Sequence, residues 1–335
     1  MNIYDVAKKA NTSTATVSRV LNGKTGVSEK TRTKILKIMD DLGYVPNGLA
    51  QGLSVDSLKM VGVLCYDISD IYCAEIVSLL EKLLRANGYD MLLCCTGDEE
   101  VSNKKYFDIL LSKRVDAIFL VSSKYSLDVD NEYIARVSAT IPVLLLNSGI
   151  DVENVYSIVC DDRLAIEEAV GFLVSQGHRR IAYLHGELIF SGKRQLKGYM
   201  DGLAANGIEP DERLIVRNTF YNETLLEAGM KMTQWLLDEG VDFTAILVSD
   251  DPYAAGAIKV LSACGVRIPE DVEVIGYDNS AVCSYTTPEL SSIDSNINAI
   301  TKIAVQYFLN KQKGEAVPRR TVLTAELVHR GSTMT

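Results

Sequence analysis

The sequence predicts an α/β protein in which a small head of three helices precedes a body built on parallel sheets. Three observations lead to this fold class. Residues 2–43 carry three short helical patterns with capping residues between them. From Met60 onward, short apolar runs alternate with amphipathic stretches at intervals of roughly 25–30 residues. The length of 335 residues also exceeds what one compact core usually holds.

The first two helical patterns are separated by a turn of three residues. Asn2 is suited to cap the first helix, and the acid Asp5 would face its free amides. Ser13 can cap the second, which covers residues 14–22 and buries the stripe of Val17, Val20 and Leu21. A polar second helix docked on an apolar first one is typical of a helix-turn-helix, whose second helix enters the DNA major groove.

A third helical pattern completes the head. Ser28 can cap it, and three helices around one small core make a complete domain. Its apolar residues recur at helical spacing: Ile35, Leu36, Met39 and Leu42.

The segment after the head reads as a linker. Asn47 could cap a short helix ending at Leu53, but Gly48 and Gly52 would each cost it about 1 kcal/mol. So short a helix does not hold alone in water. Composition therefore favours a flexible linker over a segment that folds only on DNA.

The body shows a repeated strand–helix–strand pattern. Such repetition predicts parallel sheets with helices on both faces. Eight strands are more than one small open sheet usually carries, which favours two lobes. The expected strands are Val61–Cys65, Met91–Cys95, Ala117–Val121, Val143–Leu146, Ser157–Cys160, Ile181–Leu184, Ala245–Val248 and Val272–Ile275. Helical stretches between them include Ala74–Ala86, Leu164–Ser175, Leu225–Leu237 and Ala254–Ala263.

Charge is distributed unevenly along the chain. Residues 1–59 contain nine Lys and Arg against five Asp and Glu, a balance of +4. Subtracting this from the net charge of −10 leaves −14 on the remainder. A basic head on an acidic body can attract phosphate groups without making the whole protein bind polyanions.

We expect neither disulfides nor a membrane span. The seven cysteines form no CxxC pair and mostly lie in or beside apolar runs, which indicates buried thiols in a reducing cytosol. The three histidines lack metal-ligand spacing. No apolar run approaches the roughly 20 residues that cross a bilayer, and the chain begins without a signal segment. The expectation is a cytoplasmic protein with no metal and no cofactor.

Several motifs strongly resemble the lactose/galactose repressor family of bacterial transcription regulators. The resemblance runs from residue 3 to about residue 333 and follows the family's order. The motifs are Tyr4–Ala7, Ala15–Gly23, Val27–Arg32, Leu42–Asn47, Gly177–Leu184, Ile275–Asn279 and Val328–Thr333. The resemblance implies a homodimer on a pseudo-palindromic double-stranded DNA operator.

The resemblance also implies the domain organisation. A helix-turn-helix domain would cover residues 1–45 and a hinge helix residues 46–58, which reverses the linker interpretation. Residues 59–335 would form an effector-binding and dimerisation domain of two lobes, as in periplasmic sugar-binding proteins. The lobes would comprise about 59–160 with 292–322, and about 161–291 with 323–335. The chain carries no leucine-heptad tail of the kind that makes tetramers in one branch, so we expect a dimer.

The resemblance places DNA contacts in the head and hinge. Arg19 can donate two hydrogen bonds to guanine, and Leu53 holds the position of the leucine that wedges into the minor groove. Gly48 and Gln51 depart from the family's alanine and arginine, so we expect a hinge that is more disordered off DNA. The expected contacts are Tyr4, Ser13, Thr14, Ala15, Thr16, Ser18, Arg19, Asn22, Asn47, Ala50 and Leu53.

The resemblance places an effector pocket between the lobes, near strand C-termini. Carboxylates can accept pairs of sugar hydroxyl hydrogens, and an aromatic ring can stack on a sugar. The resemblance therefore implies a repressor controlled by a small carbohydrate-type effector. The expected pocket residues are Asp67, Ser69, Tyr72, Asn147, Asp161, Ser191, Arg194, Gln195, Tyr221, Asp251 and Asp278, with Phe220 an alternative to Tyr221. Helix capping is the alternative role for Asp161 and Asp251.

Two departures from the family leave other triggers open. Ser148 stands where the family often has an arginine, and Gln195 replaces the pocket arginine, with Arg194 one position earlier. A purine or a phosphorylated sugar remains an alternative effector. So does a phosphocarrier protein, as in the catabolite control branch, although Gln306 stands where that branch tends to be basic.

The sequence argues against an enzyme. Adjacent acids such as Asp161 and Asp162 point apart at a strand end, which suits neither glycosidase geometry. The chain also contains no P-loop and no GxSxG elbow. We therefore assign no catalytic residue.

Overall fold

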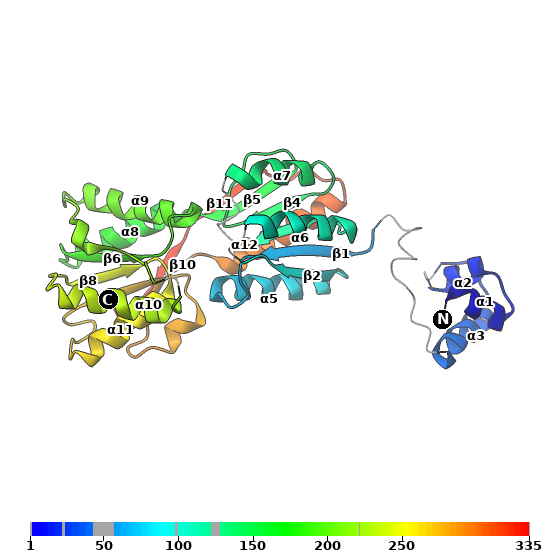
Figure 1. Cartoon of the computed structure of the whole chain (residues 1–335), viewed down its shortest axis with the longest axis horizontal. Coiled ribbons are helices and arrows are strands. Elements are labelled where there is room, and N and C mark those ends of the chain that lie inside the picture. The colour runs from blue at the N-terminus through cyan, green and yellow to red at the C-terminus, as the bar shows by residue number, and fades with distance from the viewer. Residues whose placement is uncertain are drawn as a thin grey trace. The chain divides into compact units, whose positions relative to one another are not determined.

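The computed structural model describes residues 2–21, 24–42, 57–97, 100–121, 128–220 and 222–334. The chain divides into two compact units, which we call the head (Met1–Lys59) and the body (Met60–Thr335) (Figure 1). Five residues of the predicted sites lie outside the described residues: Asn22, Asn47, Ala50, Leu53 and Tyr221.

The helices of the head begin at the predicted caps. Asn2 accepts hydrogen bonds from the amides of Tyr4 and Asp5, and the Asp5 carboxylate accepts one from the Asn2 amide at 2.9 Å. Ser28 accepts from the amide of Thr31 in the third helix. These bonds satisfy amides that the start of a helix leaves unpaired. The bounds are α1 (Ile3–Ala10), α2 (Thr14–Leu21) and α3 (Glu29–Asp41).

The core of the head is small, and one predicted member is absent from it. The prediction that Leu36 belongs to this core is wrong, because its side chain is 50% exposed. Each residue along an α-helix turns the side chain by about 100°, so Leu36 faces away from the side that Ile35 occupies. Ile38, nearly one turn after Ile35, packs against the core instead. The buried core consists of Val6, Ala7, Ala10, Val17, Val20, Ile35 and Met39.

Two basic side chains of α3 tie the other helices to it. The Arg32 guanidinium donates to the carbonyl of Val20 at 3.3 Å and to that of Lys24 at 2.9 Å. Lys34 Nζ donates to the carbonyl of Ala10 at 2.9 Å. Carbonyls at the end of a helix have no partner within the helix. Part of the positive charge of the head therefore serves its own packing.

The first lobe of the body is built on six strands and four helices. The strands are β1 (Met60–Cys65), β2 (Asp90–Cys95), β3 (Ile118–Val121), β4 (Val143–Leu146), β5 (Val155–Cys160) and β11 (Arg320–Leu323). The helices are α5 (Ile71–Ala86), α6 (Glu100–Ser112), α7 (Asp128–Ser138) and α12 (Ile297–Gln312). All strand pairs are parallel, in the order β11-β5-β4-β3-β1-β2.

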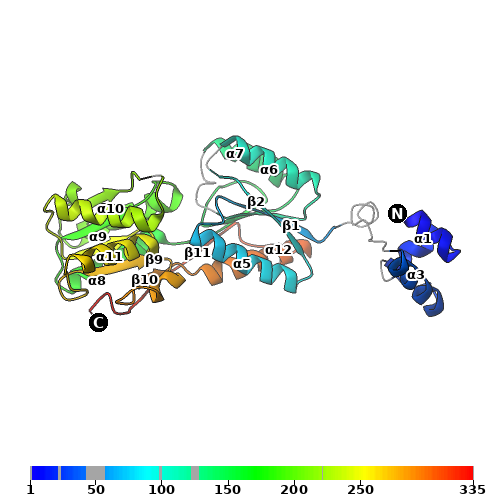
Figure 2. The same ribbon diagram turned by 60° about the horizontal axis from the view of Figure 1, so that its bottom comes forward.

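Helices cover both faces of this sheet. Figure 2 shows α6 and α7 on one side and α5 and α12 on the other. Alternate residues of a strand face opposite sides of a sheet. Val63 of β1 therefore packs with α5 and α12, whereas Leu64 packs with α6 and α7.

The second lobe repeats this plan. Its strands are β6 (Ile181–His185), β7 (Ile215–Arg217), β8 (Ala245–Val248), β9 (Glu273–Tyr277), β10 (Ser291–Asp294) and β12 (Glu326–Val328). Its helices are α8 (Asp162–Ser175), α9 (Phe190–Ala205), α10 (Leu225–Asp238) and α11 (Asp251–Ala263), with short 3-10 helices η2 (Glu212–Leu214) and η3 (Ala281–Ser284). The order is β12-β10-β9-β8-β6-β7, and only β12 is antiparallel among these pairs.

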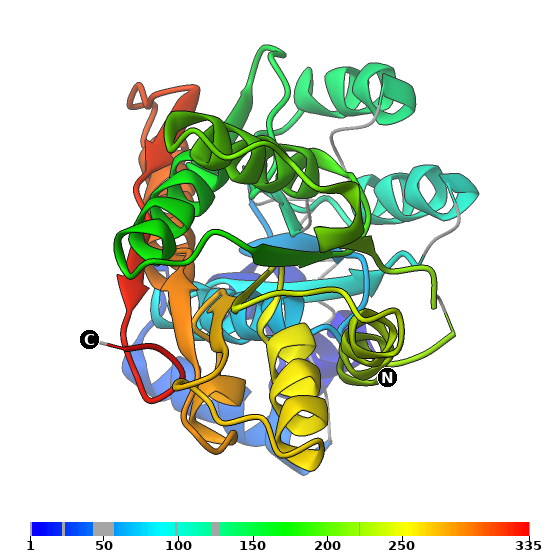
Figure 3. The ribbon, with the colours of Figure 1, turned by 90° about the vertical axis from the view of Figure 1, so that its left-hand side faces the viewer.

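The second sheet also has two covered faces. Figure 3 looks onto this lobe and shows green α8 and α9 on one side and yellow α10 and α11 on the other. Tyr183 packs with α8 and α9, whereas Leu184 packs with α10 and α11. The prediction of two lobes with helix-covered, mostly parallel sheets is therefore confirmed.

The eight predicted strands are all present, and four further strands were not predicted. The latter are β7, β10, β11 and β12, each three or four residues long. β10 is buried but polar: Ser292 Oγ donates to Asp251 at 2.6 Å, and Ser291 Oγ accepts from the Arg330 amide at 2.8 Å. Such a strand leaves no apolar run in the sequence. It also carries the second sheet to Asp294, a few residues beyond the boundary expected at 292.

The cysteines fit the prediction only in part. All seven are free, and four are buried: Cys65, Cys73, Cys160 and Cys283. Cys95 and Cys264 are exposed, because Cys95 ends the edge strand β2 and Cys264 follows the last turn of α11. Within the described ranges, no helix is both long and apolar enough to cross a membrane.

Candidate functional site

The outward face of α2 carries small side chains and one arginine. Ala15 and Arg19 are exposed, and Thr14 and Ser18 are partly buried. Val17 points the other way and is fully buried in the head core. In the described part of the chain, no side chain pairs with the Arg19 guanidinium. This face can therefore approach another surface closely while Arg19 offers it five N–H donors.

The start of α2 is held by two of the predicted DNA-contact residues. Ser13 Oγ accepts from the Thr16 amide at 3.2 Å and shares a hydrogen bond of 2.9 Å with Thr16 Oγ1. The prediction that Ser13 caps this helix is confirmed. The positive end of a helix dipole attracts phosphate, so the cap lies where an anion is favoured. Tyr4, near the start of α1, is 70% exposed.

The body contains a cavity of about 680 Å³ to which both lobes contribute. In each sheet the first strand along the chain, β1 or β6, lies between the second and the third, so the winding direction reverses beside it. Ligands of open α/β sheets bind at such reversals, beyond the carboxyl ends of the strands. The cavity is lined by the segments that follow β1, β4, β6, β7, β8 and β9.

Eight predicted pocket residues line this cavity. They are Asp67, Ser69, Tyr72, Asn147, Ser191, Gln195, Asp251 and Asp278. Phe220, the alternative to Tyr221, lines it as well. The Gln195 side chain reaches the carbonyl of Ser249 at 3.4 Å and so supports the turn after β8.

Asp161 and Arg194 do not reach the cavity lining. Asp161 caps α8 through the amide of Leu164 and pairs with Arg194 Nη2 at 2.6 Å. Arg194 Nε also lies 3.7 Å from the buried carboxylate of Asp162. The guanidinium is thus held between two acids of its own lobe, which fits the capping alternative for Asp161.

Asp251 lines the cavity but has no free oxygen. Its Oδ1 accepts from Ser292 at 2.6 Å, and its Oδ2 accepts from the amide of Ser280 at 2.7 Å and from the Cys283 thiol. Burial raises the pKa of Asp251, and these hydrogen bonds oppose the rise. Asp251 therefore fastens η3 and β10 to α11, and its neighbour Asp250 faces the cavity.

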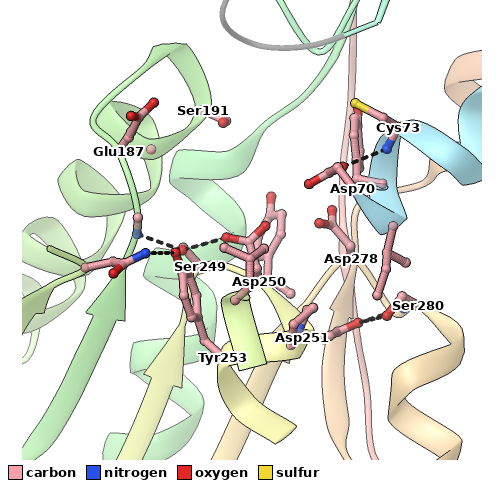
Figure 4. A pocket seen from close by; sticks show the side chains of 18 of the residues that line it. Asp70, Cys73, Glu187, Ser191, Ser249, Asp250, Asp251, Tyr253, Asp278 and Ser280 are labelled. Atoms are coloured by element: carbon pink, nitrogen blue, oxygen red, sulfur yellow. Dashed lines mark hydrogen bonds between the residues drawn. The ribbon is translucent and has the colours of Figure 1, made fainter. Parts of the chain in front are cut away.

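Five acids of the cavity lining were missed by sequence reasoning, and Asp70 and Asp250 are two of them. Asp70 caps α5 by accepting from the Cys73 amide at 2.8 Å. Asp250 Oδ2 accepts from Ser249 Oγ at 2.8 Å. Burial, followed by the charge of Asp70, raises the pKa of Asp250 to about 7. Figure 4 shows Asp70, Asp250 and Asp278 around one space, the first from the first lobe and the others from the second.

Asp278 sits in a constrained turn after β9. Its φ of 93° is unusual for a residue with a side chain, and the residue lines the cavity directly after β9. Asp278 Oδ1 accepts from Ser295 Oγ at 2.7 Å. Burial raises its pKa well above the usual range, and the charges of Asp250 and Asp251 add to the rise.

The comparisons with known proteins cover the whole chain. Residues 2–47 match the family "Bacterial regulatory proteins, lacI family", and residues 170–333 match "Periplasmic binding protein-like domain". An "HTH-type transcriptional regulator" from Lachnoclostridium phytofermentans is 39% identical, over 99% of this chain and 99% of its own.

Two solved structures resemble the chain over nearly its full length. The lac repressor dimer bound to operator and the anti-inducer ONPF has a TM-score of 0.88 at 29% identity, covering 100% of this chain and 99% of its own. The transcriptional regulator CelR in complex with cellobiose has a TM-score of 0.72 at 27% identity, covering 99% of each chain.

Proposed function

This chain belongs to the lacI family of bacterial regulatory proteins, and we propose that it is a repressor whose operator affinity is set by a small carbohydrate bound in the body. It is a DNA-binding transcriptional regulator and not an enzyme. The cavity between the two lobes is the observation that carries the effector proposal. Its volume suits a small ligand, and the related CelR binds cellobiose in its solved complex.

The proposed DNA contacts follow from the exposed face of α2. Thr14, Ala15 and Arg19 would read base edges in the major groove, with Arg19 donating two hydrogen bonds to a guanine. Two heads of a homodimer would read the two halves of a pseudo-palindromic operator. Leu53, outside the described residues, would wedge the minor groove at the centre.

The proposed control is a linkage between the cavity and the heads. A ligand that binds one arrangement of the lobes better than the other shifts the dimer toward that arrangement, and operator affinity follows. The coupling needed is typically about 1–3 kcal/mol. The proposal covers both induction and co-repression.

Thermal unfolding tests the effector half of the proposal. The purified chain would be melted with millimolar monosaccharides, disaccharides, sugar phosphates and purines. A ligand at 100 times its dissociation constant adds about 2.7 kcal/mol to the folded state, which raises the melting temperature of the body by a few degrees. A response to purines alone, or to a phosphocarrier protein alone, would contradict a carbohydrate effector.

Binding to operator DNA tests the other half. Leu53→Ala should weaken binding to a selected pseudo-palindromic site far more than binding to random DNA, because only the specific complex is bent. Equal losses on both DNAs would contradict the minor-groove role of Leu53.

A further inference from the structure

The lining of the cavity is strongly acidic. Among the described residues that line it, none is a lysine, an arginine or a histidine. The nearest predicted cation, Arg194, is held by Asp161 outside the lining. Eight lining residues are acids: Asp67, Asp70, Glu75, Glu187, Glu223, Asp250, Asp251 and Asp278.

Three of these acids present an oxygen that the described residues leave without a donor. Asp70, Asp250 and Asp278 each accept one side-chain or amide hydrogen bond on one carboxylate oxygen. For the other oxygen of each, no donor is present in the described ranges. All three are partly buried, and removing carboxylates from water is unfavourable unless a partner neutralises them.

A second observation places a missing hydrogen-bond donor in the same cavity. Asn147 is only 8% exposed and lines the cavity, yet no described residue donates a hydrogen bond to its Oδ1. The hydroxyl of Tyr72, another lining residue, is buried and likewise has no hydrogen-bond partner in the described part of the chain. Buried polar groups in proteins nearly always find a partner. A ligand that donates several hydrogen bonds would supply it.

We propose that the ligand is an amino sugar whose protonated amine lies among Asp70, Asp250 and Asp278 and whose hydroxyl groups donate to Asn147 and the remaining carboxylates. This proposal rests on the proposed carbohydrate effector and adds that the effector carries a positive charge. Phosphorylated and carboxylated sugars are disfavoured, because they would add negative charge beside these three acids.

The position of the acids also links the charge of the ligand to the arrangement of the lobes. Asp70 belongs to the first lobe, whereas Asp250 and Asp278 belong to the second. Like charges on facing walls oppose their approach, and a cation between them removes that opposition. A neutral sugar fills the same space without removing this repulsion. A metal ion is a poorer candidate, because in the described ranges no three His, Cys, Asp or Glu side chains are placed to hold one.

Calorimetry on matched sugar pairs tests the proposal with the full-length protein. The members of each pair differ only at C2, where the amino sugar carries an ammonium group in place of a hydroxyl: glucosamine with glucose, galactosamine with galactose, mannosamine with mannose, and fully deacetylated chitobiose with cellobiose. At least one amine should bind about tenfold more tightly than its neutral partner, as expected for a charge-assisted contact. Binding at pH 7 should also release protons for the amine and not for the neutral sugar, because the cation lowers the raised pKa of Asp250.

Two variants locate the amine. Asp250→Asn and Asp70→Asn remove one charge from opposite lobes, and asparagine can still cap α5 at position 70. Each should lower the affinity for the amine about tenfold and that for the neutral sugar by a clearly smaller factor, because only the amine loses a charge-assisted contact. Asp238→Asn, an exposed acid on α10, removes the same charge from the second lobe away from the cavity and should change neither.

The possible results separate this inference from the proposed function. Equal or tighter binding of the neutral sugars would overturn the amine and leave the carbohydrate effector standing. Binding of spermidine with no sugar of either kind would overturn both. An unchanged preference in Asp250→Asn and Asp70→Asn, with normal thermal unfolding, would also overturn the proposed position of the amine.

Discussion

The exposed face of α2, which we propose reads DNA, and the wall of the cavity use polar side chains in contrasting ways. Arg19 and Ala15 project from one helix and make no side-chain hydrogen bond in the described part of the chain. In the cavity, Asp251 is buried and Asp278 is partly buried, and both are hydrogen-bonded to serines of other segments. A side chain that makes no stabilising contact within its own domain can be replaced without unfolding the protein. The cavity acids combine ligand recognition with the packing of their own walls, so substitutions there affect both.

The substitution with the largest expected effect should unfold the head and leave the body folded. Ile35→Ala removes a fully buried side chain from a core of seven, and such a change typically costs about 2–5 kcal/mol. A domain this small is marginally stable, so we expect the head to unfold and DNA binding to disappear. Calorimetric melting should show the body transition and sugar binding unchanged. A parallel fall in the body transition would mean that the two units do not fold independently.

Asp162 should give the body a stability that depends on pH. It is fully buried, and burial raises its pKa from 3.8 to about 7 despite the hydrogen bond from Tyr277 and the nearby Arg194. The folded protein therefore holds this proton more tightly than the unfolded chain, and the resulting stability is lost as pH rises from about 4 to 7. Asn carries no such proton.

The matching measurement is denaturant unfolding of Asp162→Asn and the parent chain from pH 5 to pH 8. Between pH 5 and pH 8, the free energy of unfolding of the variant should rise relative to that of the parent by on the order of 2 kcal/mol. The raised pKa values of Asp250 and Asp278 act in the same direction, so part of the slope should remain. A stability difference that is constant with pH would show that Asp162 does not titrate in this range.

Arg19→Ala tests the opposite case, a residue with a function and little structural role. Loss of two hydrogen bonds to a guanine should cost about 1–3 kcal/mol at one base per half-site and relax the preference there. The melting temperature of the head should hardly change, because exposed substitutions lie within about 0.5 kcal/mol. Selection of sites from random DNA measures the preference. The same selected site for variant and parent would remove Arg19 from base reading.

The smallest expected effects come from a matched pair of helix caps. Ser28→Ala in the head and Thr224→Ala at the start of α10 each remove one capping side chain, at a cost of about 1 kcal/mol. In the small head this should visibly reduce DNA binding at 37 °C. In the body it should only lower the melting temperature slightly. Equal functional losses would show that the head is not the less stable unit.

The exposed face of α2 was easier to predict from the sequence than the cavity lining, for a physical reason. The face comes from one turn-and-helix segment, so helical spacing alone separates outward Arg19 from buried Val17. The cavity gathers side chains from six segments of two sheets. In such segments, a shift of one position along the chain changes which side chain is available to a ligand. Both line the cavity, but the described residues donate to only one oxygen of Asp250, whereas both oxygens of Asp251 accept hydrogen bonds.

Near the start of α9, the same difference of one position decides which side chain lines the cavity. Arg194 turns toward Asp161, while Gln195, about 100° further around the helix, turns toward Ser249. The strands of the sheets were predictable wherever an apolar run marked them. β10 was not, because its buried serines are paired by hydrogen bonds that only the folded chain brings together.

The carbonyls that Arg32 and Lys34 bind in the head bear on the salt dependence of operator affinity. Each basic side chain that neutralises a phosphate displaces about one condensed counterion from the duplex, and the number displaced sets how steeply affinity falls with salt. Arg32 and Lys34 direct their N–H groups at helix ends instead. We therefore expect the logarithm of operator affinity to fall less steeply with the logarithm of salt concentration than the number of lysines and arginines in the head would indicate. Only the cations that are free to reach DNA phosphates would release counterions.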